Sequence, residues 1–248
     1  MRTVVVIPVY DEARWVSQSV SRLLQVHAPA DLVLIDDGSR DGTGAILDAL
    51  AGDCGVTVIR HETNRGKGAA IRTGMARALA MGAEIVLVHD ADLEYDPADH
   101  AAILAPLRDG RADAVIGSRF LGQTHRVLYY WHSVANGVIT TLCNMATNLN
   151  LTDVECCCKA FTRQVAEQLD LREERFGIEI ELIAKVAHLR LDNDAQDRAM
   201  GLPARRRARV YEVPVSYAGR TYEEGKKITW RDGAWALACI VRHGLTGA

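Results

Sequence analysis

The chain has 248 residues, enough for one large domain or two small ones around a buried core. Hydrophobic residues make up 48% of it and charged residues 25%, the balance of an ordinary globular protein. The formal net charge of -3 gives no support to nucleic acid as a partner. No basic N-terminal region precedes an apolar run, so the sequence predicts no signal peptide.

Polar residues interrupt the one stretch that approaches the length of a membrane span, residues 127–151. These residues, which are costly in hydrocarbon, are His132, Asn136, Asn144 and Asn148. We therefore expect no transmembrane helix.

Three of the six cysteines are adjacent, at Cys156, Cys157 and Cys158. Neighbouring cysteines do not make a disulfide framework, and no second CxxC pair completes a zinc site. We interpret them as reduced, mostly buried thiols of a cytoplasmic protein.

Strand and helix patterns alternate along the first half of the chain. Short apolar runs predict strands at residues 4–7, 32–35, 56–59, 85–88 and 114–116. Helices are expected between them, at about residues 15–24, 43–50 and 68–80 and from Pro97 onward. Pro8 and Gly117 are expected to end the first and fifth strands. Continuous apolar strands separated by helices predict an α/β fold, with a largely parallel sheet covered on both faces.

The second half is less regular. Helices are predicted at residues 127–150, 177–190 and 230–241, and residues 210–217, which contain Pro214, read as an edge strand. Residues 192–209 are polar and then strongly basic, so we expect a mobile loop there.

Polar clusters follow four of the predicted strands, at residues 8–12, 36–39, 90–94 and 117–119. In largely parallel sheets the ligand lies beyond the carboxyl ends of the strands. The convergence of these clusters predicts a single active cleft at that edge.

Asp90-Ala91-Asp92 directly follows a buried strand, and Glu94 adds a third carboxylate. Carboxylates at such a turn can hold Mg²⁺ or Mn²⁺, which would also bridge to substrate phosphates. The alternative is a solvated acidic turn. The position after an apolar strand, together with the other clusters, favours the metal site.

Asp37, at the end of the second strand, could accept hydrogen bonds from a nucleobase or a ribose. The alternative is an Asx turn that caps the next helix, and both hold if Asp36 is structural and Asp37 functional. The loop at residues 64–68 precedes a helix, so its backbone and Lys67 could meet phosphate, although a plain loop is an equal alternative.

Several cations lie outside obvious helix faces, where they could neutralise a departing diphosphate, although a solvated surface is the alternative. They are Arg119, Arg220, Lys226 and Lys227.

Together these motifs resemble glycosyltransferase family 2, which has the GT-A fold, and within it the polyprenyl-phosphate sugar synthases. The motifs that carry the resemblance are residues 6–12, 36–39, 64–68, 90–94, 117–120 and 213–227. The resemblance covers nearly the whole chain. It implies a single catalytic domain over residues 1–248, with a nucleotide-sugar-binding half at 1–120 and an acceptor-binding half at 121–248.

The resemblance also implies roles for particular residues. Those that match the nucleotide pocket of the family are Pro8, Tyr10, Glu12 and Asp37, and Lys67 and Ala91 are expected beside the donor. Asp90, Asp92 and Glu94 match the residues that hold the metal and the diphosphate, although Glu94 stands where mannose synthases often have Gln. Arg119 and the segment from Arg220 to Lys227 match the groups that handle phosphate.

The implied activity is transfer of a hexose, with inversion, from UDP-glucose or GDP-mannose to a polyprenyl phosphate. The loop at residues 64–68 favours UDP-glucose slightly. A hydroxyl acceptor would need a general base, whereas a phosphate acceptor needs none. Asp153 and Glu155 are candidates for the base, although a helix cap or a surface carboxylate is at least an equal alternative for each. The alternatives are a soluble acceptor, a sugar nucleotidyltransferase and a noncatalytic nucleotide-sugar-binding module.

We expect a cytoplasmic protein that docks peripherally on the inner face of the membrane. Two apolar clusters suit the headgroup boundary, one at residues 128–131 and the other formed by Trp230, Trp235, Leu237 and Ile240. The arginines at residues 205–209 could add attraction to anionic lipid. The alternative is that both clusters pack in the core or at a dimer interface and that the arginines are merely solvated.

Overall fold

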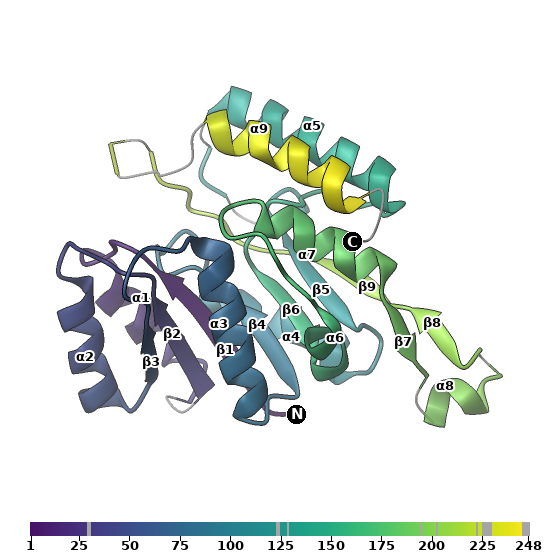
Figure 1. The fold of residues 1–248 in the computed structure, drawn as a ribbon, viewed down its shortest axis with the longest axis horizontal. Helices are drawn as coiled ribbons and strands as arrows, with labels where there is room; N and C mark the ends of the chain where they lie inside the picture. Colours follow the sequence, from purple (N-terminus) through teal and green to yellow (C-terminus); the bar gives the residue numbers. More distant parts are fainter. Residues whose placement is uncertain are drawn as a thin grey trace.

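A mixed sheet forms the centre of the molecule, with its strands in the order β3-β2-β1-β4-β6-β5-β9 (Figure 1). This computed structural model describes residues 1–28, 31–122, 125–127, 129–193, 195–201, 203–221, 223–224 and 230–244. The strands are β1 (Thr3–Val9), β2 (Leu32–Asp36), β3 (Thr57–Arg60), β4 (Ile85–Val88), β5 (Ala114–Ser118), β6 (Lys159–Thr162) and β9 (Val210–Pro214). Neighbours are parallel except at β6, which runs antiparallel to β4 and β5. The predicted α/β fold with a largely parallel sheet is confirmed.

Helices cover both faces of this sheet. One face is covered by α1 (Val16–Leu23), α2 (Thr43–Cys54) and α4 (His100–Arg108), and the turn η2 (Pro97–Asp99) precedes α4 with Pro97 at its start. The other face is covered by α3 (Lys67–Ala80), α6 (Arg163–Gln168) and α7 (Ile178–His188). Because side chains alternate along a strand, Val5 and Ile7 of β1 pack in the first core cluster, whereas Val4 and Val6 pack in the second.

A third layer lies over α7, where α5 (Tyr130–Thr147) and α9 (Trp230–Cys239) run side by side (Figure 1). A short π-helical turn, η3 (Ile240–Gly244), follows α9. Cys143, Ile180, Ile183 and Cys239 join α5, α7 and α9 in a third core cluster. No helix within the described ranges is long and apolar enough to span a bilayer.

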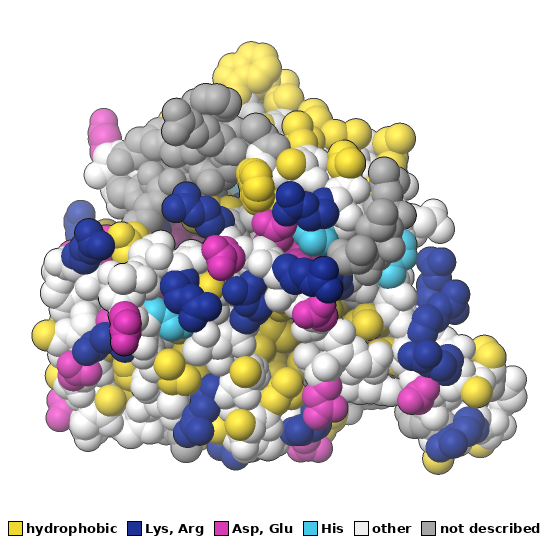
Figure 2. Space-filling view, in the orientation of Figure 1, with side chains coloured by type: hydrophobic (Ala, Val, Ile, Leu, Met, Phe, Trp, Pro, Cys, Tyr) yellow, Lys and Arg dark blue, Asp and Glu magenta, His cyan; other side chains and the backbone are white. Residues whose placement is uncertain are grey.

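The outer face of this layer exposes large apolar side chains, which gather along the top of the molecule in Figure 2. We call these residues the α5–α9 surface: Tyr130, Trp131, Val134, Val138, Leu142, Met145, Trp235, Leu237 and Val241. Ile240, which the sequence placed in the exposed cluster, is buried instead. Leu128 and the side chain of Trp230 lie outside the described residues.

Pro8 and Gly117 do not end their strands, contrary to the sequence analysis. The carbonyl of Val6 accepts from His89 N and that of Val9 accepts from Asp37 N, so the even-numbered residues of β1 face β4. Pro8 faces the same side beyond the last residue of β1 that pairs with β4, so its missing N–H interrupts no ladder. Gly117 pairs with Val213 and donates to the carbonyl of Cys158.

The basic segment at residues 192–209 is not the expected loop. It contributes to a small antiparallel sheet of β7 (Arg190–Asp192) and β8 (Arg205–Arg207), with α8 (Ala195–Ala199) between them. The side chains of Arg206 and Arg209 both donate to the buried carboxylate of Asp113, at 2.5–3.2 Å. This contact ties the small sheet to the start of β5. The following strand, β9, is an edge strand as predicted.

Replacing Asp113 by Ala is expected to lower the free energy of unfolding by about 3 kcal/mol, because the mostly buried Arg206 loses its partner. The matched control is Asp192→Ala, which removes the partner of Arg205 from an exposed ion pair and should cost less than about 1 kcal/mol. Urea denaturation measures both values. Equal losses in the two variants would contradict the assignment.

Candidate functional site

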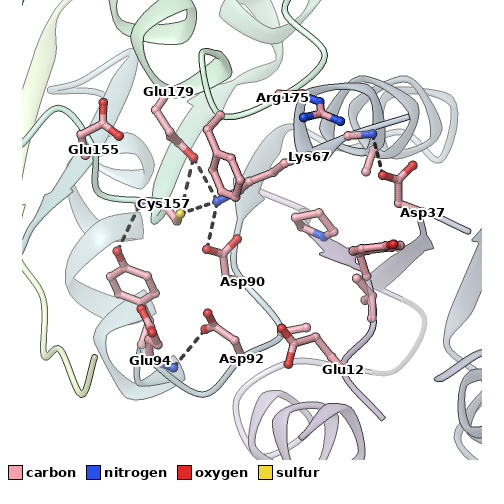
Figure 3. A pocket seen from close by; sticks show the side chains of 18 of the residues that line it. Glu12, Asp37, Lys67, Asp90, Asp92, Glu94, Glu155, Cys157, Arg175 and Glu179 are labelled. Atoms are coloured by element: carbon pink, nitrogen blue, oxygen red, sulfur yellow. Dashed lines mark hydrogen bonds and ion pairs between the residues drawn. The ribbon is translucent and has the colours of Figure 1, made fainter. Parts of the chain in front are cut away.

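A cavity of about 800 Å³ opens at the carboxyl ends of the strands, where the sequence analysis expected the cleft (Figure 3). Most of the predicted site residues line it: Pro8, Tyr10, Glu12, Asp37, Lys67, Asp90, Ala91, Asp92, Glu94, Arg119 and Arg220. They come from the end of β1, from the loops after β1, β2, β4 and β5, from the start of α3 and from the segment after β9. Lys226 and Lys227 lie outside the described residues.

Arg220 is surrounded by carboxylates from two strand ends. Its guanidinium contacts Asp92 at 2.8 Å, Glu12 at 3.2 Å and Glu94 at 3.4 Å, and its side chain is 12% exposed. Glu94 also accepts from the Arg220 backbone N–H and from the Tyr217 hydroxyl. Burial raises the pKa of Asp92 to about 7, and the charges of Glu94 and Asp90 act in the same direction against Arg220. The cluster therefore holds more negative charge than Arg220 neutralises.

Lys67 forms a second cationic centre on the other side of the same turn (Figure 3). Its Nζ lies 3.0 Å from Asp90, 3.2 Å from Glu179 and 2.5 Å from the Cys157 sulfur. Burial alone would raise the pKa of Asp90, but Lys67 and the Cys157 hydrogen bond bring it below its usual value. Asp90 and Asp92 are thus held by different cations, although only one residue separates them.

The carboxylate of Asp37 is occupied by the loop that follows β3. It accepts from the backbone N–H groups of Arg65 at 3.0 Å and Gly66 at 2.7 Å, and it contacts His61 at 2.6 Å. Gly66 has a φ of 96°, and a Cβ there would lie 2.3 Å from the carbonyl oxygen of Glu174, so the turn requires glycine. Asp37 therefore shapes the wall of the cavity by fixing this loop.

Asp36 serves the fold, as the sequence analysis proposed. One oxygen accepts from Ser39 N at 2.9 Å and the other binds Arg60 at 2.9 Å. The two neighbouring aspartates therefore have different structural roles. Asp36 stabilises the turn that follows β2, and Asp37 fixes the loop that follows β3.

Arg119 lies in the cavity wall with its charge already balanced. Its guanidinium makes a two-point contact with Asp153, at 2.6 and 2.8 Å, and stacks over the Tyr217 ring. Asp153 is fully buried and does not line the cavity, which removes it as a candidate base. Glu155 does line the cavity, and burial together with the charge of Glu179 raises its pKa to about 7.

Asn64, from the predicted loop at residues 64–68, also lines the cavity. Further lining residues were not predicted as site residues, among them Ala70, Tyr95, Cys157, Arg175, Phe176, Glu179 and Tyr217. Glu179 lies in the first turn of α7 and Cys157 lies shortly before β6, and no local pattern marks either as functional. Their partner Lys67 lies far away in the sequence, so only the fold brings them to the cleft.

The expected metal ligands are not gathered around one point in this structure. Asp90 turns toward Lys67, whereas Asp92 and Glu94 turn toward Arg220. Among the described residues, the trio with ligand atoms within 4.8 Å of one another is instead His89, His100 and Cys158. The oxygen donors and excess charge at Asp92 and Glu94 nevertheless suit a hard divalent cation.

Asp92→Asn is expected to raise the free energy of unfolding at pH 8, by up to a few kcal/mol. The unfolded chain titrates Asp92 near pH 4, and the folded protein does so at about 7, so folding takes up a proton between those values. The contribution of Asp92 to wild-type stability therefore falls as the pH rises from about 4 to 7, and the variant escapes this loss. Urea denaturation with EDTA at pH 5 and pH 8 measures it, and a pH-independent difference would refute this account.

A family model described as Glycosyl transferase family 2 matches residues 4–170. Polyprenol monophosphomannose synthase of Mycolicibacterium smegmatis is 32% identical over 173 residues, which cover 68% of this chain and 65% of that protein. Undecaprenyl-phosphate mannosyltransferase of Micrococcus luteus is 26% identical over 256 residues, which cover 99% of this chain and 95% of that protein. The resemblance to polyprenyl-phosphate sugar synthases is thereby confirmed.

Solved structures agree on the fold. Glucosyl-3-phosphoglycerate synthase from Mycobacterium tuberculosis, crystallised with Mn²⁺, UDP and glucosyl-3-phosphoglycerate, superposes with a TM-score of 0.67 at 18% identity. The match covers 98% of this chain and 80% of that one, and it confirms the predicted GT-A fold. Since the family model covers well over half of the sequence, this chain belongs to glycosyl transferase family 2.

Proposed function

We propose that this protein transfers a hexose, with inversion, from a nucleotide diphosphate sugar to a polyprenyl phosphate. The observation that carries the proposal is the cleft at the strand ends, where three carboxylates and Arg220 converge. The nearly full-length likeness to an undecaprenyl-phosphate mannosyltransferase supports the choice of acceptor. UDP-glucose and GDP-mannose are the candidate donors. The mannose in the names of both relatives favours the second, against the slight preference drawn from the sequence.

The two halves of the chain would divide the substrates. Pro8, Tyr10 and Glu12 border the cavity from the end of β1, and Asp37 fixes the adjoining loop, so residues 1–120 would bind the nucleotide sugar. Residues 121–248 supply Glu155, Tyr217 and Arg220 to the same cavity and would face the acceptor.

The carboxylates of Asp90, Asp92 and Glu94 would hold a Mg²⁺ or Mn²⁺ ion. When bound, such an ion acts as a Lewis acid that stabilises the charge of the leaving diphosphate. Arg220 already contacts Asp92 and Glu94, so its guanidinium would be placed to donate to a diphosphate bound at this ion. Lys67 keeps Asp90 ionised and in position.

A phosphate acceptor is already anionic near neutral pH and needs no general base. A second candidate function is transfer to a soluble hydroxyl acceptor, and one feature favours it. The Oε1 atom of Glu155 is buried and has no hydrogen-bond partner within the described ranges, and this residue borders the cavity. With a pKa of about 7, it could take a proton from a hydroxyl group.

A transfer assay separates these two functions. The intact chain is incubated with Mn²⁺, with UDP- and GDP-linked hexoses, and with either a short polyprenyl phosphate or soluble acceptors. We expect transfer to the polyprenyl phosphate, and Glu155→Gln should retain it because the phosphate needs no base. Efficient transfer to a soluble hydroxyl acceptor alone, abolished by Glu155→Gln, would replace the proposal with the second function.

Arg220→Lys is expected to lower kcat/KM about 10- to 100-fold, because a forked guanidinium becomes a point charge among three carboxylates. Arg111→Lys is the matched control, since Arg111 is exposed and pairs with Asp109 away from the cavity. Steady-state kinetics with the preferred donor measures both variants. Wild-type turnover in Arg220→Lys would show that this arginine does not handle the diphosphate.

We also propose that the α5–α9 surface docks on the membrane that carries the acceptor. Trp131 and Met145 are about three-quarters exposed, and large apolar areas that are exposed to solvent mark interaction sites. The basic run contributes less than the sequence suggested, because Arg206 and Arg209 are bound to Asp113. Apolar insertion, rather than charge, would therefore dominate the attachment.

The double substitution Tyr130→Ser and Trp131→Ser should weaken binding to phospholipid vesicles at least about tenfold, because it removes two large exposed apolar side chains. The control is Met200→Ser, an exposed apolar residue beside the small sheet. Co-sedimentation with vesicles reports the bound fraction. An unchanged bound fraction in the double variant would exclude this surface as the docking site.

A further inference from the structure

A second group of metal-type ligands lies outside the cavity that we assign to the donor. His89 follows β4 and directly precedes Asp90, His100 is the first residue of α4, and Cys158 directly precedes β6. All three side chains are buried, at 1–2% exposure, and none borders the cavity. We propose that they form a separate binding site for a transition-metal ion of the Zn²⁺ type.

Two of the three separations between the ligand atoms are close to those around a tetrahedral ion. His89 Nδ1 lies 3.0 Å from His100 Nε2 and 3.7 Å from Cys158 Sγ, and all three atoms lie within 4.8 Å of one another. Zn–N bonds of about 2.0–2.1 Å and Zn–S bonds of about 2.3 Å require separations of roughly 3.3 Å between nitrogens and roughly 3.6 Å between nitrogen and sulfur. The two pairs that include His89 need shifts of a few tenths of an ångström, whereas His100 and Cys158, whose ligand atoms lie within 4.8 Å of each other, would close by up to about 1.2 Å on binding.

His27 gives His100 the support that a ligating histidine needs. His27 Nε2 lies 2.7 Å from His100 Nδ1, so His100 can donate its Nδ1–H to His27 and keep its Nε2 lone pair for the metal. A hydrogen bond to the other ring nitrogen is the usual way in which proteins fix the tautomer and orientation of a ligating imidazole. Among the three proposed ligands, His100 therefore has the tautomer and ring orientation best fixed for binding a metal ion.

The donor set determines which ion the site prefers. Two imidazole nitrogens and one thiolate suit zinc and other borderline or soft metals, whereas Mg²⁺ and Mn²⁺ prefer the carboxylates of the cleft. On binding, the Cys158 S–H bond breaks, its proton passes to solvent, and a sulfur–metal bond takes its place. The two sites thus differ in chemistry as well as in position.

The sequence analysis found no zinc site because Cys158 has no CxxC partner. The histidines come instead from other elements, and His89 lies 69 residues away in the sequence. An ion here would tie the end of β4, which carries Asp90, to α4 and to the start of β6. Its role would be to hold the strand end that presents the catalytic carboxylates.

The competing explanation is a chain of hydrogen-bonded histidines that binds no metal. To separate the two, Co²⁺ is titrated into the purified full-length chain in the presence of excess Mg²⁺, which occupies carboxylate sites. We expect a thiolate-to-cobalt charge-transfer band that saturates at one ion per chain. Cys158→Ser should lose this band, and the neighbouring control Cys157→Ser should keep it.

A second variant guards against misfolding of the first. Zn²⁺ at a hundredfold excess over its Kd should raise the Tm of the wild type by roughly 5 °C or more, whereas His100→Gln should show no such shift. Circular dichroism confirms that each variant is folded. The proposal is overturned if the wild type shows no thiolate band, or if folded Cys158→Ser and His100→Gln bind Co²⁺ with the wild-type spectrum. Neither result would decide whether the protein is a transferase, because transfer is measured in the separate assay described above.

Discussion

The cleft depends on two buried cations that hold mutually repelling carboxylates together. Arg220 joins Glu12 to Asp92 and Glu94, and Lys67 joins Asp90 to Glu179. Buried carboxylates without such partners would be too costly to keep ionised. Because each cation comes from a different part of the chain than the acids that it binds, the charge balance also brings distant segments to one edge of the sheet.

The antiparallel strand β6 explains how the second half of the chain reaches this edge. It lies between β4 and β5, so the residues that precede it arrive beside the end of β4. Cys157 there contacts Lys67, and the buried Lys159 at the start of β6 pairs with Glu179. A purely parallel continuation would have carried these residues to the opposite edge, so the reversal of this one strand completes the cavity.

Local sequence patterns were enough to predict the strands whose side chains are apolar and buried. β4 was predicted to the residue, because four aliphatic side chains in a row are all buried. β6 was missed, because its first residue is a lysine whose burial depends on the Cys156 carbonyl and on Glu179, on a later helix. The segment at residues 192–209 was misread for the same reason, since Arg206 looks solvated until the fold supplies Asp113. In the site, strand ends located the carboxylates, but no local signal could tell which cation each one binds.

The carboxylates around Arg220 carry enough negative charge for a metal ion as well as for the arginine. Glu12, Asp92 and Glu94 carry three negative charges when ionised and Arg220 carries one positive charge, so the cluster has a formal excess of two negative charges. Burial, together with the charges of Glu94 and Asp90, raises the pKa of Asp92 to about 7. One divalent cation would cancel the excess negative charge. Under the proposed function, Arg220 and a metal would therefore be complementary rather than alternative partners of these carboxylates, and a bound metal would leave the guanidinium available for the negative charge of a diphosphate.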